Sequence, residues 1–349
     1  MAVLSCCPPS IGRCYEQLLT RLGGQHDEVM TFAVRGAIEA VYPEAIAMLT
    51  DASHQVHEVS RVLPAFPILG PTNPNSQVVM AVADLPRWPT GLAQRVTCHE
   101  CGTPHHVVVL SVHLLRVHEY LLGVASECIE VVPEPGQIRI RVHDVDSGWK
   151  GVSDVGVATL RQLLQSCRTG SAGEYAPAPF RFEGTSGYRM AMIRAAGLSW
   201  LAAHELAHTS EKNCLIPVES WTAFSDPAYA KEEYEADQAA LRILMHRSVA
   251  KAPLNHDERF TLFAGCELLL HTLDVVQAAA EGSLANRHQR ESSRGPLSLM
   301  SRFELLAPLM THCGELFANQ VYRDWRLPYL CALEVAIHRA LFGQGVHHA

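Results

Sequence analysis

The stretch 198–209, LSWLAAHELAHT, constrains this chain more than any other. It contains His204, Glu205 and His208 in the order H-E-x-x-H. In a helix, residues four apart lie on the same face, so the two imidazoles can bind one zinc ion together. Glu205 is the next residue around the helix, where it can accept a proton from water on the metal. The motif therefore predicts a helix that carries part of a catalytic zinc site.

The sequence around this motif favours a helix over 187–210. Residues 187–208 are rich in helix-forming types and contain no proline, and Thr185 and Ser186 can cap the start. Gly197 costs such a helix about 1 kcal/mol relative to alanine. The alternative is a buried helix with two hydrogen-bonded histidines and no metal.

A second acidic motif, EEYEAD at 232–237, can complete the site. It falls in a segment, 227–249, that is expected to be helical. There Glu233 and Asp237 lie one turn apart, so Glu233 can reach the metal while Asp237 accepts a hydrogen bond from a ligand imidazole. Glu232 stands at the start of a neighbouring face of the same helix, so helix geometry alone does not choose between the two glutamates. Without the metal, these acids are a solvated helix start, which the helix dipole favours.

Together the two motifs resemble those of gluzincin metallopeptidases, in which HExxH is followed by E-x-x-A-D on a second helix. They are similar to HtpX-type and CAAX-prenyl-protease-type peptidases, which are embedded in membranes. The soluble ImmA/IrrE-like and phage-exclusion Lit-type peptidases are the better match, because no window of this chain has the uninterrupted apolar length of a membrane span. The resemblance implies His204, His208 and Glu233 as zinc ligands and Glu205 as general base.

The function expected from this resemblance is a zinc-dependent endopeptidase that cuts an intracellular protein, in phage defence or a stress response. An activating or an inhibitory protein partner would control the activity of such an enzyme. A further donor would stabilise the oxyanion. Tyr234 and His246 are the first choices, with Tyr229 and His271 as alternatives, although a buried tyrosine or a capping histidine explains each of them equally well.

Two other functions remain open. One is a non-catalytic interaction protein that zinc stabilises, although a structural site has no need of a base such as Glu205 beside the metal. The other is an ImmA-like regulator that cleaves a repressor.

A second metal question concerns Cys98 and Cys101, which stand in CHECG and resemble half of a zinc ribbon. His105 or His106 could be the third ligand of a structural zinc. A fourth would have to come from a distant cysteine, such as Cys7, Cys14 or Cys128. Because a closed site needs four ligands and no second C-x-x-C exists, two reduced thiols are the favoured interpretation.

Composition excludes several classes of protein. The formal net charge of −8 and the lack of a basic run argue against nucleic-acid binding. The N-terminus, MAVLSCCPPS, lacks the basic and apolar regions of a signal peptide. Eleven cysteines without evident paired spacing fit reduced thiols, so we expect a cytoplasmic protein without a membrane anchor.

The expected fold class is α+β. Residues 1–168 form a mixed α/β recognition or regulatory region, 169–180 a linker or loop, and 181–349 a mainly helical, zincin-like peptidase domain. Residues 1–25 read as irregular. The expected strands are 77–83, 106–112 and 137–142, and the further helices are 27–59, 155–167, 256–281, 300–320 and 328–342.

Overall fold

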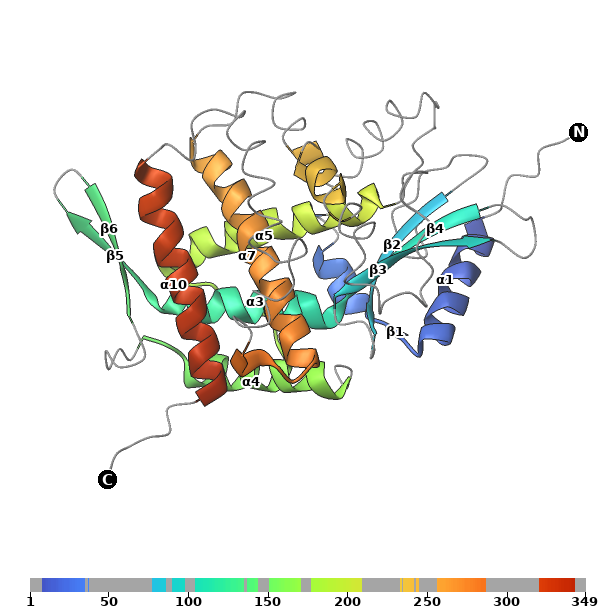
Figure 1. The fold of residues 1–349 in the computed structure, drawn as a ribbon, viewed down its shortest axis with the longest axis horizontal. Helices are drawn as coiled ribbons and strands as arrows, with labels where there is room; N and C mark the ends of the chain where they lie inside the picture. Colours follow the sequence, from blue (N-terminus) through green and yellow to red (C-terminus); the bar gives the residue numbers. More distant parts are fainter. Residues whose placement is uncertain are drawn as a thin grey trace, which may run out of the picture. The chain divides into compact units, whose positions relative to one another are not determined.

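The structure is a computed structural model that describes residues 8–34, 37, 77–85, 90–97, 104–134, 137–143, 151–170, 177–208, 233, 235–241, 243–244, 256–286 and 320–342. Among them helices predominate, with a four-stranded and a two-stranded sheet (Figure 1). The expected α+β class is confirmed at this level.

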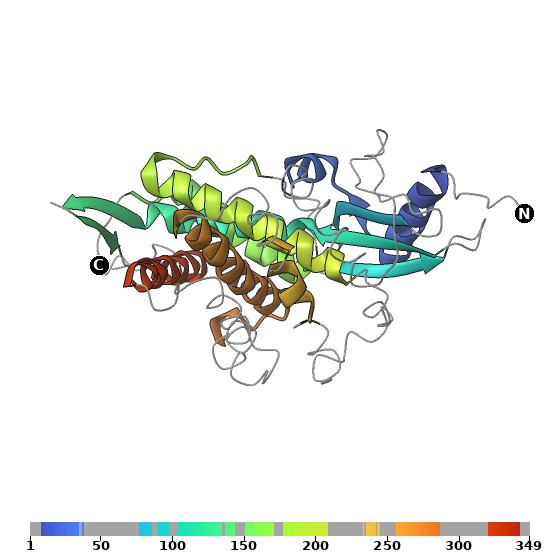
Figure 2. The ribbon, with the colours of Figure 1, turned by 90° about the horizontal axis from the view of Figure 1, so that it is seen from above.

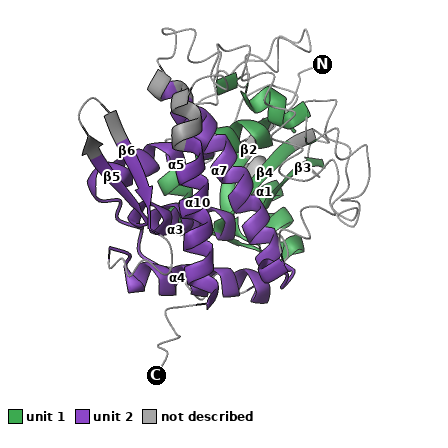
Figure 3. Ribbon diagram, turned by 60° about the vertical axis from the view of Figure 1, so that its left-hand side comes forward, with its two compact units in different colours: residues 1–112, 198–254, 291–306 green, residues 113–197, 255–290, 307–349 purple. Residues whose placement is uncertain are grey.

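The chain divides into two compact units (Figure 3). The first comprises residues 1–112, 198–254 and 291–306, and the second 113–197, 255–290 and 307–349. One of the boundaries between them, 197/198, falls within a helix, α5 (Gly184–Ala207). The division into domains on either side of 169–180 stays a prediction.

The first unit contains a mixed sheet in the order β1-β2-β4-β3, formed by Gln25–His26, Gln77–Asp84, Pro104–Ser111 and Gly91–Thr97 respectively. β2 and β4 pair in parallel, whereas β1 and β3 are antiparallel to their neighbours. The central strands are apolar on both faces, as strands covered on both sides must be. This confirms the strand expected at 77–83 and the one expected at 106–112 as far as Ser111, since Val112 already begins a helix. Strands β1 and β3 were not foreseen.

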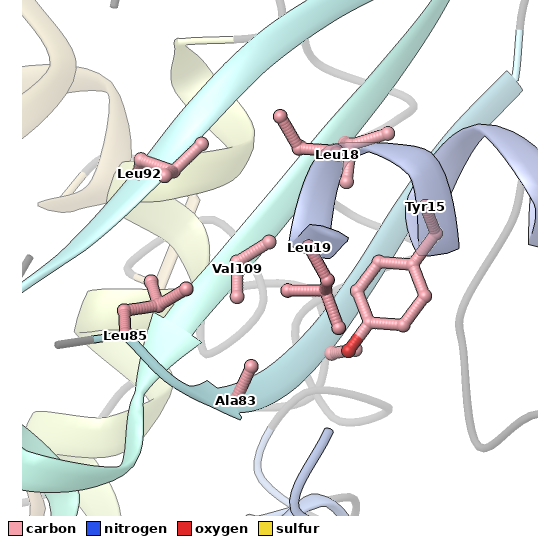
Figure 4. Packing of buried hydrophobic residues seen from close by; sticks show 9 residues of the cluster. Tyr15, Leu18, Leu19, Ala83, Leu85, Leu92 and Val109 are labelled. Carbon is pink, nitrogen blue, oxygen red and sulfur yellow. The ribbon is translucent and has the colours of Figure 1, made fainter. Parts of the chain in front are cut away.

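Helix α1 (Pro8–Leu22) covers one face of this sheet (Figure 4). Tyr15, Leu18 and Leu19 pack there in one buried cluster with Ala83 and Val109. The expectation of an irregular N-terminus was therefore wrong over these residues. The two prolines at the start of α1 do not break the helix. Backbone N–H groups in the first turn have no intrahelical acceptor, so the missing N–H of proline costs no hydrogen bond there.

The second unit is built around α3 (Val112–Glu127), which is buried along nearly its whole length. The antiparallel hairpin β5–β6 (Ile129–Glu134, Gln137–Val142) follows it. Next come α4 (Asp154–Thr169), α7 (His256–Ala280), the short 3-10 helix η4 (Leu284–Asn286) and α10 (Gln320–Phe342). α10 lies beside α7 and also contacts α4 and β6 (Figures 1 and 2).

These elements confirm the strand expected at 137–142 and the helices expected at 155–167 and 256–281. The start expected at Pro328 was wrong, because α10 begins at Gln320 and runs through this proline. A proline inside a helix costs about 3 kcal/mol, and buried side chains such as Tyr329 and Leu333 offset that cost. Of the helix expected at 27–59, residues 28–34 are helical, and most of the remainder lies outside the described residues, as do 300–319.

Among the described residues, Phe260–Ala280 of α7 is long and apolar enough to cross a bilayer. Most of this segment is buried within the protein, as the core helix of a globular fold is, so its composition is weak evidence for a membrane span.

Helix α5 confirms the helix expected around HExxH, with bounds Gly184–Ala207. Its N-terminal part crosses α7 closely at Gly197 and Gly265, where a Cβ on Gly197 would lie 2.9 Å from the Gly265 carbonyl oxygen. Its C-terminal part belongs to the first unit, where Trp200, Leu201 and Leu206 are buried. The burial of this part fixes the rotation of the helix, and hence the direction in which its histidines point.

Candidate metal centre

His204 and His208 meet at the C-terminal end of α5, as their spacing predicts. Their Nε2 atoms are 3.1 Å apart and their rings meet edge to face, with centroids separated by 4.8 Å. His204 is almost fully buried, at 5% exposure, while His208 and Glu205 are partly exposed. The pair therefore lies where a buried helix reaches the surface of the first unit.

Glu233 supplies the third donor from a separate helical segment. Its Oε2 lies 3.5 Å from His204 Nε2 and its Oε1 lies 3.4 Å from His208 Nε2. The described residues around it, 233, 235–241 and 243–244, are helical, in agreement with the helix expected at 227–249. Ala236, Ala240 and Leu244 of this segment are buried and anchor it in the unit.

These three residues fit a zinc ion. One ligand atom from each lies within 4.8 Å of the others. A tetrahedral ion with bonds of about 2.0–2.1 Å requires ligand atoms about 3.3–3.4 Å apart. The donor pairs His204–His208, His208–Glu233 and His204–Glu233 lie 3.1, 3.4 and 3.5 Å apart. Each imidazole thus faces a different oxygen of the Glu233 carboxylate, and one ligand atom from each residue lies within 4.8 Å of the other two, which is close to the spacing that zinc requires.

Asp237 orients the inner histidine. Its Oδ1 lies 2.9 Å from His204 Nδ1, and its side chain is completely buried. Burial alone would lower the pKa of His204, but hydrogen bonds to Asp237 and Glu233 and the attraction of both carboxylates outweigh it and raise that pKa. Asp237 lies on the Nδ1 side of the ring, and Nε2 is the nitrogen that faces Glu233 and His208. A metal would replace the proton at this nitrogen.

Glu233 remains ionised in this environment. Burial by itself would raise its pKa, but hydrogen bonds and charge attraction from His204 and His208 lower it well below its usual value. A carboxylate that stays charged at neutral pH is the form that binds a metal.

Trp200 is a part of the site that the sequence reasoning did not identify. It lies one turn before His204, and its indole is tilted by 33° against the imidazole at a centroid distance of 5.3 Å. The signal was available in the sequence, since residues four apart share a helix face.

Several predicted site residues fall outside the described part of the chain, namely Tyr229, Glu232, Tyr234, His246, Cys98 and Cys101. The backbone of His105 belongs to β4, but its side chain also lies outside the description. His271 lies on α7 and so belongs to the second unit. The structural zinc and the oxyanion donors therefore stay predictions.

Two of the cysteines considered as distant ligands are described. Cys14 lies on α1 and Cys128 directly follows α3, and both are buried. Burial raises the pKa of Cys128 to about 12, so this thiol stays protonated at neutral pH.

The fold and the site define an α+β protein with a cluster of two histidines and one glutamate of metal-binding geometry. Comparison with family models, curated proteins and solved structures finds no match for the chain. The function must therefore be argued from the cluster itself.

Proposed function

We propose that this chain is a zinc-dependent peptidase of the gluzincin kind. The observation that carries the proposal is the convergence of His204, His208 and Glu233 from two separate helical segments. If the H-E-x-x-H sequence were accidental, the Glu233 carboxylate would not be expected to lie at ligand spacing from His204 Nε2. Nor would a second carboxylate, that of Asp237, be expected to contact Nδ1 of the same ring.

The donor set favours catalysis over a structural role. Catalytic zinc sites use three protein ligands and keep the fourth position for water or substrate, whereas structural sites are closed by four. Among the residues that the structure describes, this cluster has three donors, two of them partly exposed. That argues against the alternative of a non-catalytic, zinc-stabilised interaction protein.

A zinc ion held there would lower the pKa of a water molecule and polarise a substrate carbonyl. The role proposed for Glu205 follows from its place beside His204 on the partly exposed side of α5. Its carboxylate accepts the proton of the attacking water while the new C–O bond forms. It then passes that proton to the amine nitrogen as the C–N bond breaks. His204, His208 and Glu233 hold the ion, and Asp237 keeps His204 oriented.

The resemblance to Lit-type and ImmA/IrrE-like peptidases extends the proposal to the target. It points to a protein or peptide substrate inside the cell, with a role in phage defence, in stress or in removing a repressor. Tyr234 and His246 remain the proposed oxyanion donors.

Peptide cleavage by wild type and by two single-residue variants tests this function. Zinc-loaded wild type, Glu205→Gln and Glu235→Gln are each incubated with a proteome-derived peptide library, and new N-termini are identified by mass spectrometry. Glu235 is the matched control, since it lies on the exposed face of the same helical segment as Glu233. We expect new N-termini with wild type and Glu235→Gln and none with Glu205→Gln, although all three retain zinc. No cleavage by zinc-loaded wild type, or equal cleavage by Glu205→Gln, would contradict the proposal.

A further inference from the structure

The largest fully buried side chain in the described part of the chain lies against a proposed metal ligand. Trp200 is 0% exposed. It precedes His204 by one turn of α5, and the two rings are separated by 5.3 Å between centroids at an interplanar angle of 33°. This is a tilted, offset arrangement in which the face of the indole is turned toward the imidazole.

Asp237 alone does not fix the His204 ring. Its contact with Nδ1 at 2.9 Å sets where that nitrogen lies, but the ring plane can still swing about this contact. His208 meets His204 edge to face, at 82°, and is itself a proposed ligand. A flat, immobile surface against the imidazole removes the remaining freedom, and Trp200 provides that surface.

Packing alone is a poor explanation for tryptophan at this position. Its Nε1 is buried and has no hydrogen-bond partner among the residues that the structure describes. A buried donor without a partner costs free energy, and phenylalanine or methionine would fill a core without that cost. What tryptophan adds is the widest aromatic face and the strongest attraction for a neighbouring positive charge.

We propose that Trp200 is a positioning residue of the metal centre. It sets the plane of His204 so that Nε2 points to the ion, and its ring face stabilises the positive charge that the imidazole takes on when Nε2 binds a cation. This inference rests on the proposed function, since it requires that His204 bind the metal.

Two substitutions of similar volume distinguish the effect of an aromatic ring at position 200 from the effect of filling the space. Trp200→Phe keeps an aromatic face, while Trp200→Met fills comparable space without one. Leu85→Ala is the control, because Leu85 is buried in the sheet core of the same unit, in the cluster with Leu18 and Val109. It destabilises the unit without touching the ligands.

The zinc dissociation constant of each protein is measured by competition with a chromophoric chelator, below the unfolding temperature of the metal-free form. The visible spectrum of the cobalt-substituted protein reports ligand geometry. We expect Trp200→Met to bind zinc about 10-fold or more weakly, within the range for residues that orient metal ligands. We expect Trp200→Phe to lose about 3-fold and to keep the wild-type cobalt bands, and Leu85→Ala to stay within about 2-fold of wild type.

Two results would overturn the inference while leaving the proposed function intact. One is zinc affinity unchanged in both Trp200 variants although their metal-free forms are less stable. The other is an equal loss of affinity in Leu85→Ala. If Trp200→Met does not fold, the affinity and cobalt spectrum of Trp200→Phe against wild type decide the matter. Wild type that binds no zinc at all would remove the proposed function and this inference together.

Discussion

Replacing Asp237 with alanine should weaken zinc binding by about 10- to 100-fold. Its carboxylate is completely buried and contacts His204 Nδ1 at 2.9 Å. A hydrogen bond to a charged group contributes about 1.5–3 kcal/mol, and 1.4 kcal/mol corresponds to a factor of 10 in an equilibrium constant. The resulting range of about 10- to 150-fold agrees with the effect known for groups that orient metal-bound histidines.

The assay compares zinc dissociation constants of wild type, Asp237→Ala and Asp237→Asn, measured at one pH by chelator competition. Asparagine keeps the size and one oxygen acceptor but loses the charge, so we expect a loss between those of wild type and alanine. Glu235→Gln, on the exposed face of the same segment, should bind zinc as wild type does. An unchanged constant in Asp237→Ala would refute the argument that Asp237 holds His204 in place.

Two further predictions concern the second unit. Gly265→Ala should lower the free energy of unfolding by about 1–3 kcal/mol, since its Cβ would lie 2.6 Å from the Gly197 backbone nitrogen. Gly156→Ala, whose Cβ would meet only side chains at 3.3 Å or more, is the control, and equal stability of the two variants in urea unfolding would contradict the close crossing. Burial and the charge of Arg194 lower the pKa of His118 to about 3, so between pH 6.5 and 3 the unfolded chain binds a proton that the folded protein does not. Stability is therefore lost as the pH falls through this window, by about 2 kcal/mol between pH 7.5 and pH 5. The stability of His118→Gln should therefore fall less over this pH range. An identical pH dependence of stability in both proteins would show that His118 does not contribute to the loss.

The ligand set of the candidate site could be predicted from the sequence because it depends on local periodicity. Spacing of four residues puts His204 beside His208 and Glu233 beside Asp237, whatever the rest of the fold does. What spacing could not decide was which carboxylate faces the histidines. The resemblance chose Glu233, and the structure places it 3.4–3.5 Å from both imidazoles.

Features that depend on contacts between distant segments could not be predicted in this way. Gly197 reads in the sequence only as a weak point of a helix. In the structure it is the position where α5 and α7 approach too closely for a Cβ. Strand β3 escaped prediction because GLAQRVT mixes polar and apolar residues without clear alternation, and its pairing with β4 is what makes it a strand.

Zinc stoichiometry by elemental analysis tests the central claim most directly. It is measured on wild type, Glu233→Ala and the double variant Cys98→Ser/Cys101→Ser, each purified without added metal. The account predicts zinc in wild type that is lost from Glu233→Ala and kept at this site in the cysteine variant. A second equivalent lost only from the cysteine variant would add a structural zinc. Zinc fully retained in Glu233→Ala, or none in wild type, would contradict the claim that His204, His208 and Glu233 form a metal centre.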